Sequence, residues 1–325
     1  MSDVTLRPWS PDDDLPGVLR LLQASLGWGD GPDFRRFFEW KHREGAFGPS
    51  PAWVAVDGET IVGLRILMRW EFESGDGGAR AVRAVDTATH PDHQGRGIFS
   101  RLTRLALEDL ERDGVDFVFN TPNDKSRPGY LKMGWQEVGR LPVHVRPLSL
   151  RGLVRIARAR TAADRWSARS TAGDPAASVV SDRDALARLL AARRPPSGTR
   201  TRVTPEYLAW RYGGDLLPYR AVVAGAGLSS GVALFRVRER GAAREAALCE
   251  VLTAGGDDAV GRELVRRVVR AADADYLLAL KGSVPGRGLL PLPGQGPMLT
   301  WRKVATPRSD PPADWQLGLG DIELF

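Results

Sequence analysis

The sequence is poor in the residues that form disulfides and metal sites. Of its 325 residues, one is cysteine (Cys249) and four are histidine. A single cysteine cannot form an intrachain disulfide, and zinc or iron–sulfur sites need several thiolates or clustered histidines. We therefore expect no internal disulfide and no metal ion.

The sequence also lacks a long apolar run. No segment approaches the roughly 18 to 20 apolar residues of a membrane-spanning helix, and residues 1–14 lack the basic and then apolar pattern of a secretory leader. With 42% hydrophobic and 26% charged residues, the composition is that of a globular protein. We expect a cytoplasmic protein without a membrane partner, and its length suits two domains.

Lysine is scarce: five of the 46 basic residues are lysine, which leaves 41 arginines. With 40 acidic residues, the net charge is 46 − 40 = +6. Six of the arginines fall within 151–170, where Asp164 is the one acidic residue. This segment suits a solvated helical connector or a surface for polyanions. Nucleic-acid binding would also need a recognisable fold or interleaved aromatic residues, so we expect a connector and no nucleic-acid partner.

Similar blocks recur in the same order in the two halves of the chain. Each half has a helix end with a tryptophan, then a hairpin, then a strand, loop, helix and strand. The paired blocks are 38–41 with 208–211, 53–72 with 219–239, and 81–120 with 244–281. This order predicts an α+β fold of two lobes. We expect a first domain at 1–147, an arginine-rich connector at 148–175, a second domain at 176–306 and a tail at 307–325 that docks on the body.

A glycine loop lies between a strand and a helix in the first half. Gly95 and Gly97 let the backbone turn so that several N–H groups converge, and the helix that begins at Ile98 adds the positive end of its dipole. This geometry suits a pyrophosphate. Glycine is also what any tight turn needs, so the glycine pair alone does not identify a ligand.

Two motifs around this loop resemble those of the GNAT superfamily of acyl-CoA-dependent N-acyltransferases. The run Gln94, Gly95, Arg96, Gly97, Ile98 and Phe99 resembles the family's motif A, Gln/Arg-x-x-Gly-x-Gly/Ala, with Phe99 where Gly or Ala is usual. Downstream, Asn123 and then Tyr130-x-x-x-Gly134-Trp135 resemble the family's Asn and Tyr-x-x-x-Gly-aromatic pattern. The resemblance implies two tandem GNAT-fold lobes, each a mixed, mostly antiparallel sheet flanked by helices.

The resemblance also implies an acyl-CoA, most simply acetyl-CoA, and a role for each matching residue. The pyrophosphate would meet the backbone of 94–99, the pantetheine would run beside Thr87, Ala88 and Thr89, and Asn123 would hold the pantetheine arm. Tyr130 would donate a proton to the departing thiolate. The alternative is that Tyr130 and Trp135 are aromatic core residues.

Removing a proton from the attacking amine requires a base, for which Asp86 is the candidate. It lies on a strand whose other residues are mostly apolar, so we expect it to face a polar cleft or to have a raised pKa. The alternative is a structural pair with a neighbouring arginine such as Arg83. His90 and His93 rank lower because they lie on the glycine loop.

The second half keeps the order of elements but loses these motifs. Gly255-Gly256-Asp257-Asp258 stands where the first half has its glycine loop, and carboxylates at a helix N-terminus repel phosphate and cap the helix themselves. A tyrosine equivalent to Tyr130 is also missing. We expect this lobe to be a degenerate GNAT-like domain that binds no CoA.

Together these features predict an N-acyltransferase that moves an acyl group by direct attack onto a primary amine of a small molecule. In layout the chain is similar to tandem GNAT enzymes that acylate amino sugars and aminoglycosides, so an amino sugar, an aminoglycoside or a natural-product amine is the expected acceptor. In related mycobacterial acetyltransferases the C-terminal carboxylate is implicated at the active site. The tail is too apolar to extend into water, so we expect it to dock in the cleft between the lobes, where Asp321, Glu323 and the terminal carboxylate of Phe325 would face the amine. A tail that adds an edge strand is the alternative. A non-catalytic module that senses acyl-CoA is the alternative function.

Overall fold

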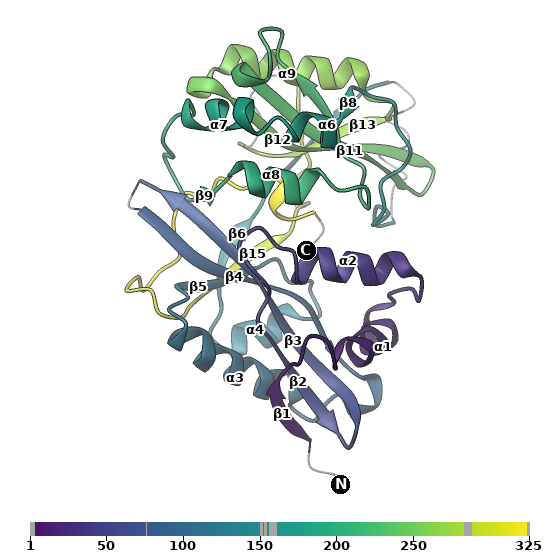
Figure 1. Cartoon of the computed structure of the whole chain (residues 1–325), viewed down its shortest axis with the longest axis vertical. Coiled ribbons are helices and arrows are strands. Elements are labelled where there is room, and N and C mark those ends of the chain that lie inside the picture. The colour runs from purple at the N-terminus through teal and green to yellow at the C-terminus, as the bar shows by residue number, and fades with distance from the viewer. Residues whose placement is uncertain are drawn as a thin grey trace.

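The chain folds into two lobes, each built on one β-sheet (Figure 1). The computed structural model describes residues 4–75, 77–149, 152, 155, 161–282 and 288–323. Within these residues, each sheet combines antiparallel strands with one parallel pair, β4 with β5 and β12 with β13. The expected α+β class is confirmed. No helix in the described part of the chain is both long and apolar enough to cross a membrane.

The first sheet has the strand order β1-β2-β3-β4-β5-β15-β6, and the short β9 pairs with β3. The elements of this lobe are β1 (Thr5–Pro8), α1 (Leu15–Leu26), α2 (Pro32–His42), β2 (Ala52–Asp57), β3 (Thr60–Ser74), β4 (Gly77–Thr89), the 3-10 helix η1 (Pro91–His93), α3 (Ile98–Arg112), β5 (Phe117–Asn120), α4 (Arg127–Lys132), β6 (Gln136–Arg140), β9 (Arg200–Thr201) and β15 (Met298–Lys303).

The second sheet has the strand order β14-β7-β13-β12-β11-β10-β8. The elements of this lobe and of the tail are β7 (Val143–Pro147), β8 (Asp174–Pro175), α6 (Ala176–Val180), α7 (Arg183–Ala191), α8 (Pro205–Tyr212), β10 (Arg220–Val223), η2 (Leu228–Ser230), β11 (Gly231–Arg240), β12 (Ala243–Thr253), η3 (Ala254–Gly256), α9 (Asp258–Ala271), β13 (Tyr276–Leu280), β14 (Leu290–Pro291) and η4 (Leu319–Asp321).

Helix α3 covers one face of the first sheet because its apolar residues recur at helical spacing. Ile98, Leu102, Ala106 and Leu110 are all at most 2% exposed, and they form a core with apolar residues of the strands beneath. Helix α9 covers the second sheet in the same way. A third, larger cluster of buried apolar residues spans both lobes.

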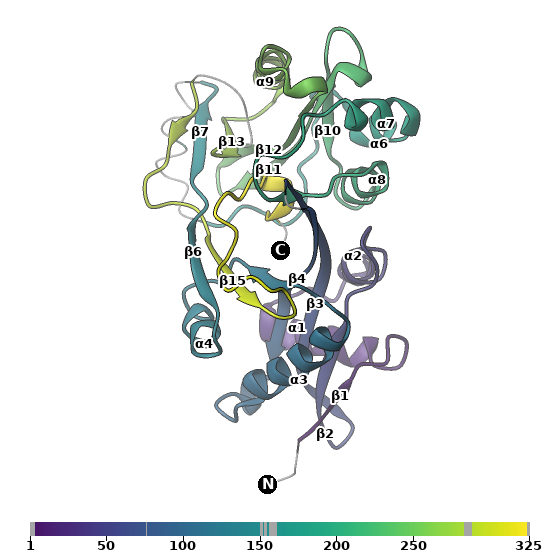
Figure 2. The same cartoon turned by 90° about the vertical axis from the view of Figure 1, so that its left-hand side faces the viewer.

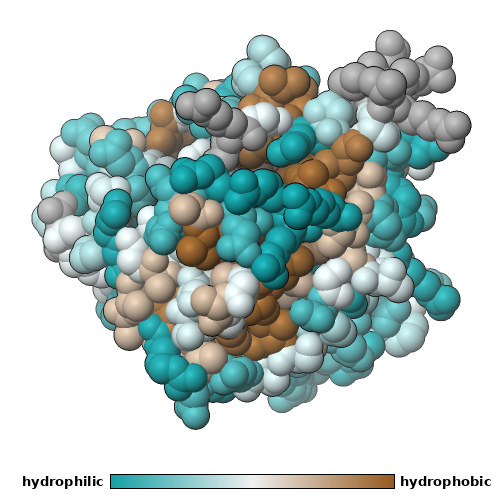
Figure 3. All heavy atoms as spheres, turned by 90° about the horizontal axis from the view of Figure 1, so that it is seen from above, coloured by the Kyte–Doolittle hydropathy of each residue, from teal (hydrophilic) through white to brown (hydrophobic). Residues whose placement is uncertain are grey.

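Seen from above, the outer end of the second lobe mixes hydrophilic and hydrophobic side chains (Figure 3).

Three described strands belong to the sheet of the other half of the chain: β7, β15 and the short β9, which pairs with β3. β7 follows β6 directly but pairs with β13, and Figure 2 shows β6 and β7 leading from the first sheet to the second. β15 returns to the first sheet, where Thr300 pairs with Asn120, 180 residues earlier. The contiguous boundaries expected at residues 147 and 306 therefore do not separate the sheets, because the free hydrogen-bonding edge of each half is completed by a strand of the other.

A reciprocal tryptophan pair joins the lobes. Trp40 of α2 and Trp210 of α8 stack with ring centroids 5.2 Å apart. Each indole nitrogen donates a hydrogen bond to the backbone carbonyl of the other residue, at 2.8 and 2.9 Å. These are equivalent positions of the repeated block at 38–41 and 208–211. The equivalent tryptophans of the two repeats therefore contact each other and make the same hydrogen bond in each direction.

Candidate active site

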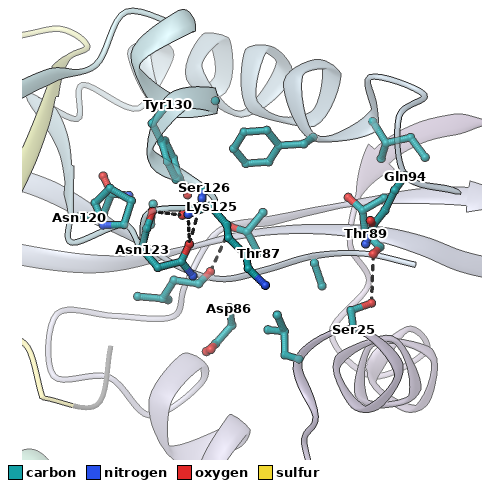
Figure 4. A pocket seen from close by; sticks show the side chains of 18 of the residues that line it. Ser25, Asp86, Thr87, Thr89, Gln94, Asn120, Asn123, Lys125, Ser126 and Tyr130 are labelled. Atoms are coloured by element: carbon teal, nitrogen blue, oxygen red, sulfur yellow. Dashed lines mark hydrogen bonds between the residues drawn. The ribbon is translucent and has the colours of Figure 1, made fainter. Parts of the chain in front are cut away.

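A cavity of about 760 Å³ lies where β4 and β5 separate. The two parallel strands pair only over Ala81 to Arg83 of β4, and beyond Arg83 the cavity opens between them (Figure 4). Eleven of the twelve residues predicted as catalytic or CoA-binding line it: Asp86, Thr87, Ala88, Thr89, Gln94, Gly95, Gly97, Ile98, Phe99, Asn123 and Tyr130. The twelfth, Arg96, lies against His93 instead, with its Nη1 2.7 Å from the imidazole Nδ1.

The glycine loop has the backbone conformation that the sequence requires of it. Gly95 and Gly97 have φ of +75° and +70°, in the left-handed region that favours glycine. Gly97 is the N-cap of α3, and no side chain in the described part of the chain caps this helix. The first-turn N–H groups of a 15-residue helix therefore lack a side-chain acceptor at the edge of the cavity. Such a helix end attracts an anion.

A β-bulge shapes the wall of the cavity on β4. Ala88 pairs with Leu64 and Val85 with Ile66, so Asp86 and Thr87 together face Arg65 alone on β3. Asp86 has φ of +42°, a strained value for a residue other than glycine. The bulge interrupts the ladder and leaves Asp86 and Thr87 both on the cavity wall.

Asp86 is held by two neighbouring residues of α2. Its Oδ2 lies 2.6 Å from Lys41 Nζ and 2.9 Å from His42 Nε2, while His42 Nδ1 lies 3.0 Å from Ser50 Oγ. Burial would raise the pKa of Asp86, but the Lys41 ammonium and the His42 hydrogen bond outweigh burial and hold that pKa well below its usual range. Burial lowers the pKa of Lys41 and of His42.

Of the two expected settings of Asp86, the structure has the cleft and not the raised pKa: the side chain lines the cavity, and its pKa is lowered. Its side chain does have a cationic partner, but this is Lys41 rather than Arg83, whose Nη2 donates to Thr121 Oγ1 at 2.9 Å. The reason is that α2 packs across the sheet and brings a lysine from 45 residues earlier under the bulge. Lys41 is one of only five lysines and lies in the repeated block 38–41, which is the signal that could have drawn attention to it.

Tyr130 is both packed and polar-bonded. Its ring is 4% exposed and makes edge contacts with Phe99 and Trp135, at centroid distances of 5.4 and 5.1 Å. Its hydroxyl oxygen accepts a hydrogen bond from Nη1 of Arg65 at 2.8 Å. Sequence reasoning missed Arg65, although an arginine within the apolar run of 61–68 is itself unusual.

The loop between β5 and α4 forms the opposite side of the cavity. The side-chain oxygen of Asn123 accepts hydrogen bonds from the backbone N–H groups of Lys125 and Ser126, at 3.1 and 2.9 Å (Figure 4). Asn123 therefore fixes the turn before α4, which carries Tyr130. Asn120, which the sequence did not single out, also lines the cavity, and its side-chain oxygen accepts a hydrogen bond from Thr300 Oγ1 at 2.7 Å.

Asp321 and Glu323, the two predicted tail residues that the structure describes, do not line the cavity. The carboxylate of Glu323 is held by arginines of the second lobe, 3.2 Å from Arg211 Nη2 and 3.0 Å from Arg236 Nε. Asp321 is 3% exposed and accepts a hydrogen bond from Thr201 Oγ1 at 2.7 Å. Phe325 is outside the described residues. Asp321 and Glu323 are thus buried, and their carboxyl groups have polar partners within the protein itself. Nothing about their positions requires an acceptor amine beside them.

The surroundings of Glu323 and Glu250 shift the pKa values of these two carboxyl groups in opposite directions. Burial alone would raise the pKa of Glu323, but Arg236, Arg238 and Arg211 lower it to about 2, against a usual 4.5. Burial and then Asp321 raise the pKa of Glu250 to about 8. The Glu323 charge therefore stabilises the fold above pH 4.5, and this contribution disappears as the pH falls towards 2. The Glu250 contribution is present below pH 4.5 and is lost as the pH rises towards 8.

Glutamine at these two positions should therefore change stability in opposite directions. We expect Glu323→Gln to lower the melting temperature at pH 7 by about 5 °C or more, because it leaves buried arginines without their counter-charge. The matched change Glu250→Gln should raise it and should flatten its dependence on pH between 5 and 8. Thermal unfolding across this pH range measures both. A similar loss of stability in both variants would contradict these charge states.

The N-terminus of α9 differs from that of α3. Oδ1 of Asp257 accepts hydrogen bonds from the N–H groups of Ala259 and Val260, at 2.7 and 3.2 Å. A carboxylate therefore already occupies the place at which an anion could bind in the second lobe.

Comparison with known proteins agrees with this geometry. Residues 6–138 match the model of the acetyltransferase (GNAT) domain family. No curated protein matches the chain in sequence.

Solved structures resemble the chain over both lobes. A GCN5-related N-acetyltransferase from Kribbella flavida is 17% identical, with a TM-score of 0.63 over 94% of this chain and 72% of that one. One from Anabaena variabilis ATCC 29413 is 10% identical, with a TM-score of 0.64 over 93% and 73%. An Enterococcus faecalis V583 protein described as a probable N-acyltransferase is 10% identical, with a TM-score of 0.63 over 94% and 73%. At these identities the likeness concerns the fold, and the family match shows that residues 6–138, about two fifths of the chain, are similar to the GNAT acetyltransferase domain.

Proposed function

We propose that the protein transfers an acyl group, most simply acetyl, from CoA to a primary amine of a small molecule by direct attack on the thioester. One observation carries the proposal: the uncapped glycine loop and the Tyr130 hydroxyl belong to the same cavity. The first can bind an anionic cofactor and the second can donate a proton. An amino sugar, an aminoglycoside or a natural-product amine is the acceptor class that we propose.

The cavity suits CoA in size and in chemistry. About 760 Å³ is within the range of ligand pockets. A Cβ at Gly95 or Gly97 would meet open space, with no atom within 4 Å, so the backbone N–H groups of this loop are accessible to a pyrophosphate. The bulged segment from Asp86 to Thr89 would lie beside the pantetheine. Bound acetyl-CoA would supply the thioester carbonyl and the thiolate leaving group.

The protein's own groups divide the remaining work. Tyr130 holds a proton at the cavity wall and donates it to the leaving sulfur. Asp86 is 14% exposed and paired with Lys41. Its low pKa makes its carboxylate a weak base, which does not readily accept a proton from the amine. We therefore assign Asp86 to orienting the amine as a hydrogen-bond acceptor, and the amine reaches the site already deprotonated or loses its proton to water.

The direct test is release of free thiol when the protein is mixed with acetyl-CoA and a panel of amines. We expect thiol release that depends on the amine and that produces the N-acetyl product by mass spectrometry. The matched panel contains the same compounds with hydroxyl in place of amine, which should give no product. Binding of acetyl-CoA without thiol release from any amine would instead indicate a sensing module.

A further inference from the structure

We propose that Arg65 is a positioning residue that aims the Tyr130 hydroxyl at the leaving sulfur and stabilises the phenolate that forms there. This inference rests on the proposed acyl transfer and adds a residue to its machinery. Arg65 lies on β3, opposite the bulge that carries Asp86 and Thr87. It is 1% exposed, so it acts from beneath the cavity wall rather than by contact with substrate.

The hydrogen bonds of Arg65 fix the direction of the Tyr130 proton. Nη1 of Arg65 donates to Tyr130 Oη at 2.8 Å and to Thr87 Oγ1 at 2.9 Å. Because the phenol oxygen accepts this bond, its own hydrogen must point elsewhere. No group among the described residues accepts that hydrogen, and Tyr130 lines the cavity. The O–H bond is therefore free to point at a sulfur atom in the cavity.

The charge of Arg65 has no counter-ion within the described part of the chain. Among the described residues, no carboxylate lies within ion-pair distance of its guanidinium, and none is a hydrogen-bond partner of its buried Nε and Nη2. Instead the guanidinium lies 5.3 and 5.6 Å from the ring centroids of Tyr130 and Phe99. A buried cation without a counter-ion is costly for folding. The cost has a use if an anion appears beside the cation during the reaction.

The proposed step produces that anion. The amine lone pair forms the N–C bond to the thioester carbonyl, and the electron pair of the C–S bond leaves on sulfur. Sulfur takes the Tyr130 proton, and the phenolate faces the Arg65 guanidinium. The amide nitrogen releases its extra proton to water, and water returns a proton to Tyr130. An ion pair made only as the thiolate leaves lowers the barrier without tightening ground-state binding.

A double-mutant cycle with Arg65→Met and Tyr130→Phe tests the inference. We expect Arg65→Met alone to lower kcat by about tenfold to a hundredfold, with KM for acetyl-CoA within about twofold. In the Tyr130→Phe background the same change should lower kcat by less than twofold, because Arg65 acts through the missing hydroxyl. A similar factor in both backgrounds would show a merely structural role and overturn the proposal.

Stability and a conservative variant supply two further readouts. Arg65→Met should unfold at the same or a higher temperature than the unaltered protein, because it removes an unpaired buried charge. Arg65→Lys keeps the charge and should retain several times the kcat of Arg65→Met; equal values would overturn the role of the charge. If Arg65→Met does not fold, the cycle is run with Arg65→Gln, which also removes the charge, and the same criterion. No thiol release by the unaltered protein would refute the proposed function itself.

Discussion

A Gly97→Glu variant is expected to lose measurable binding of acetyl-CoA while it keeps its fold. The left-handed φ of +70° at this position disfavours any side chain, and a carboxylate at the N-terminus of α3 would repel phosphate from the N–H groups. A Cβ here meets open space, so the core is not disturbed. Isothermal titration with acetyl-CoA, together with a thermal melt, measures the outcome.

The control separates charge from backbone strain. Asparagine tolerates the left-handed conformation better than most residues and adds no charge, so Gly97→Asn should retain most of the affinity. Unchanged affinity in Gly97→Glu would remove this loop from the cofactor site. Equal loss in both variants would mean that the backbone conformation matters and the charge does not.

A Tyr130→Phe variant is expected to lower kcat by about a hundredfold or more, because it removes the proton donor to the thiolate. KM for acetyl-CoA and the melting temperature should barely change, since the ring contacts with Phe99 and Trp135 need no hydroxyl. Steady-state kinetics and a thermal melt measure these quantities. An unchanged kcat across a pH series would return Tyr130 to a purely structural role.

Trp135→Phe provides the matched control for packing. The Trp135 ring contacts Tyr130 at a centroid distance of 5.1 Å, and its indole nitrogen has no hydrogen-bond partner among the described residues. This change shrinks the aromatic cluster without touching the hydroxyl. We expect it to lower the melting temperature more than Tyr130→Phe does and to lower kcat less.

Features encoded within a short stretch of chain could be predicted from the sequence. The turn at Gly95 and Gly97, the helix that follows and the position of Tyr130 all depend on residues near one another in sequence. The repeat also predicted two similar lobes. The structure has two lobes, each a β-sheet flanked by helices, and Trp40 of α2 stacks on Trp210 of α8.

Features that depend on pairing between distant segments could not be predicted in this way. Arg65 meets Tyr130 across 65 residues, and Lys41 meets Asp86 across 45, because a bulge and a packed helix bring them together. A strand pattern identifies neither its partner strand nor the bulge on it, so the sequence did not indicate that Lys41 would be the partner of Asp86. The positions of β7 and β15 escaped prediction for the same reason.

The position of β15 has a consequence for how the protein is made. A ribosome extends a chain at about 5 to 20 residues per second, and domains often fold as soon as they emerge. Here β15 (Met298–Lys303) lies between β5 and β6 in the first sheet. Asn120 on the wall of the cavity accepts its hydrogen bond from Thr300 of the same strand. The N-terminal lobe is synthesised first. Its sheet is complete, and Asn120 has its partner, only after β15 has been translated, near the end of these 325 residues.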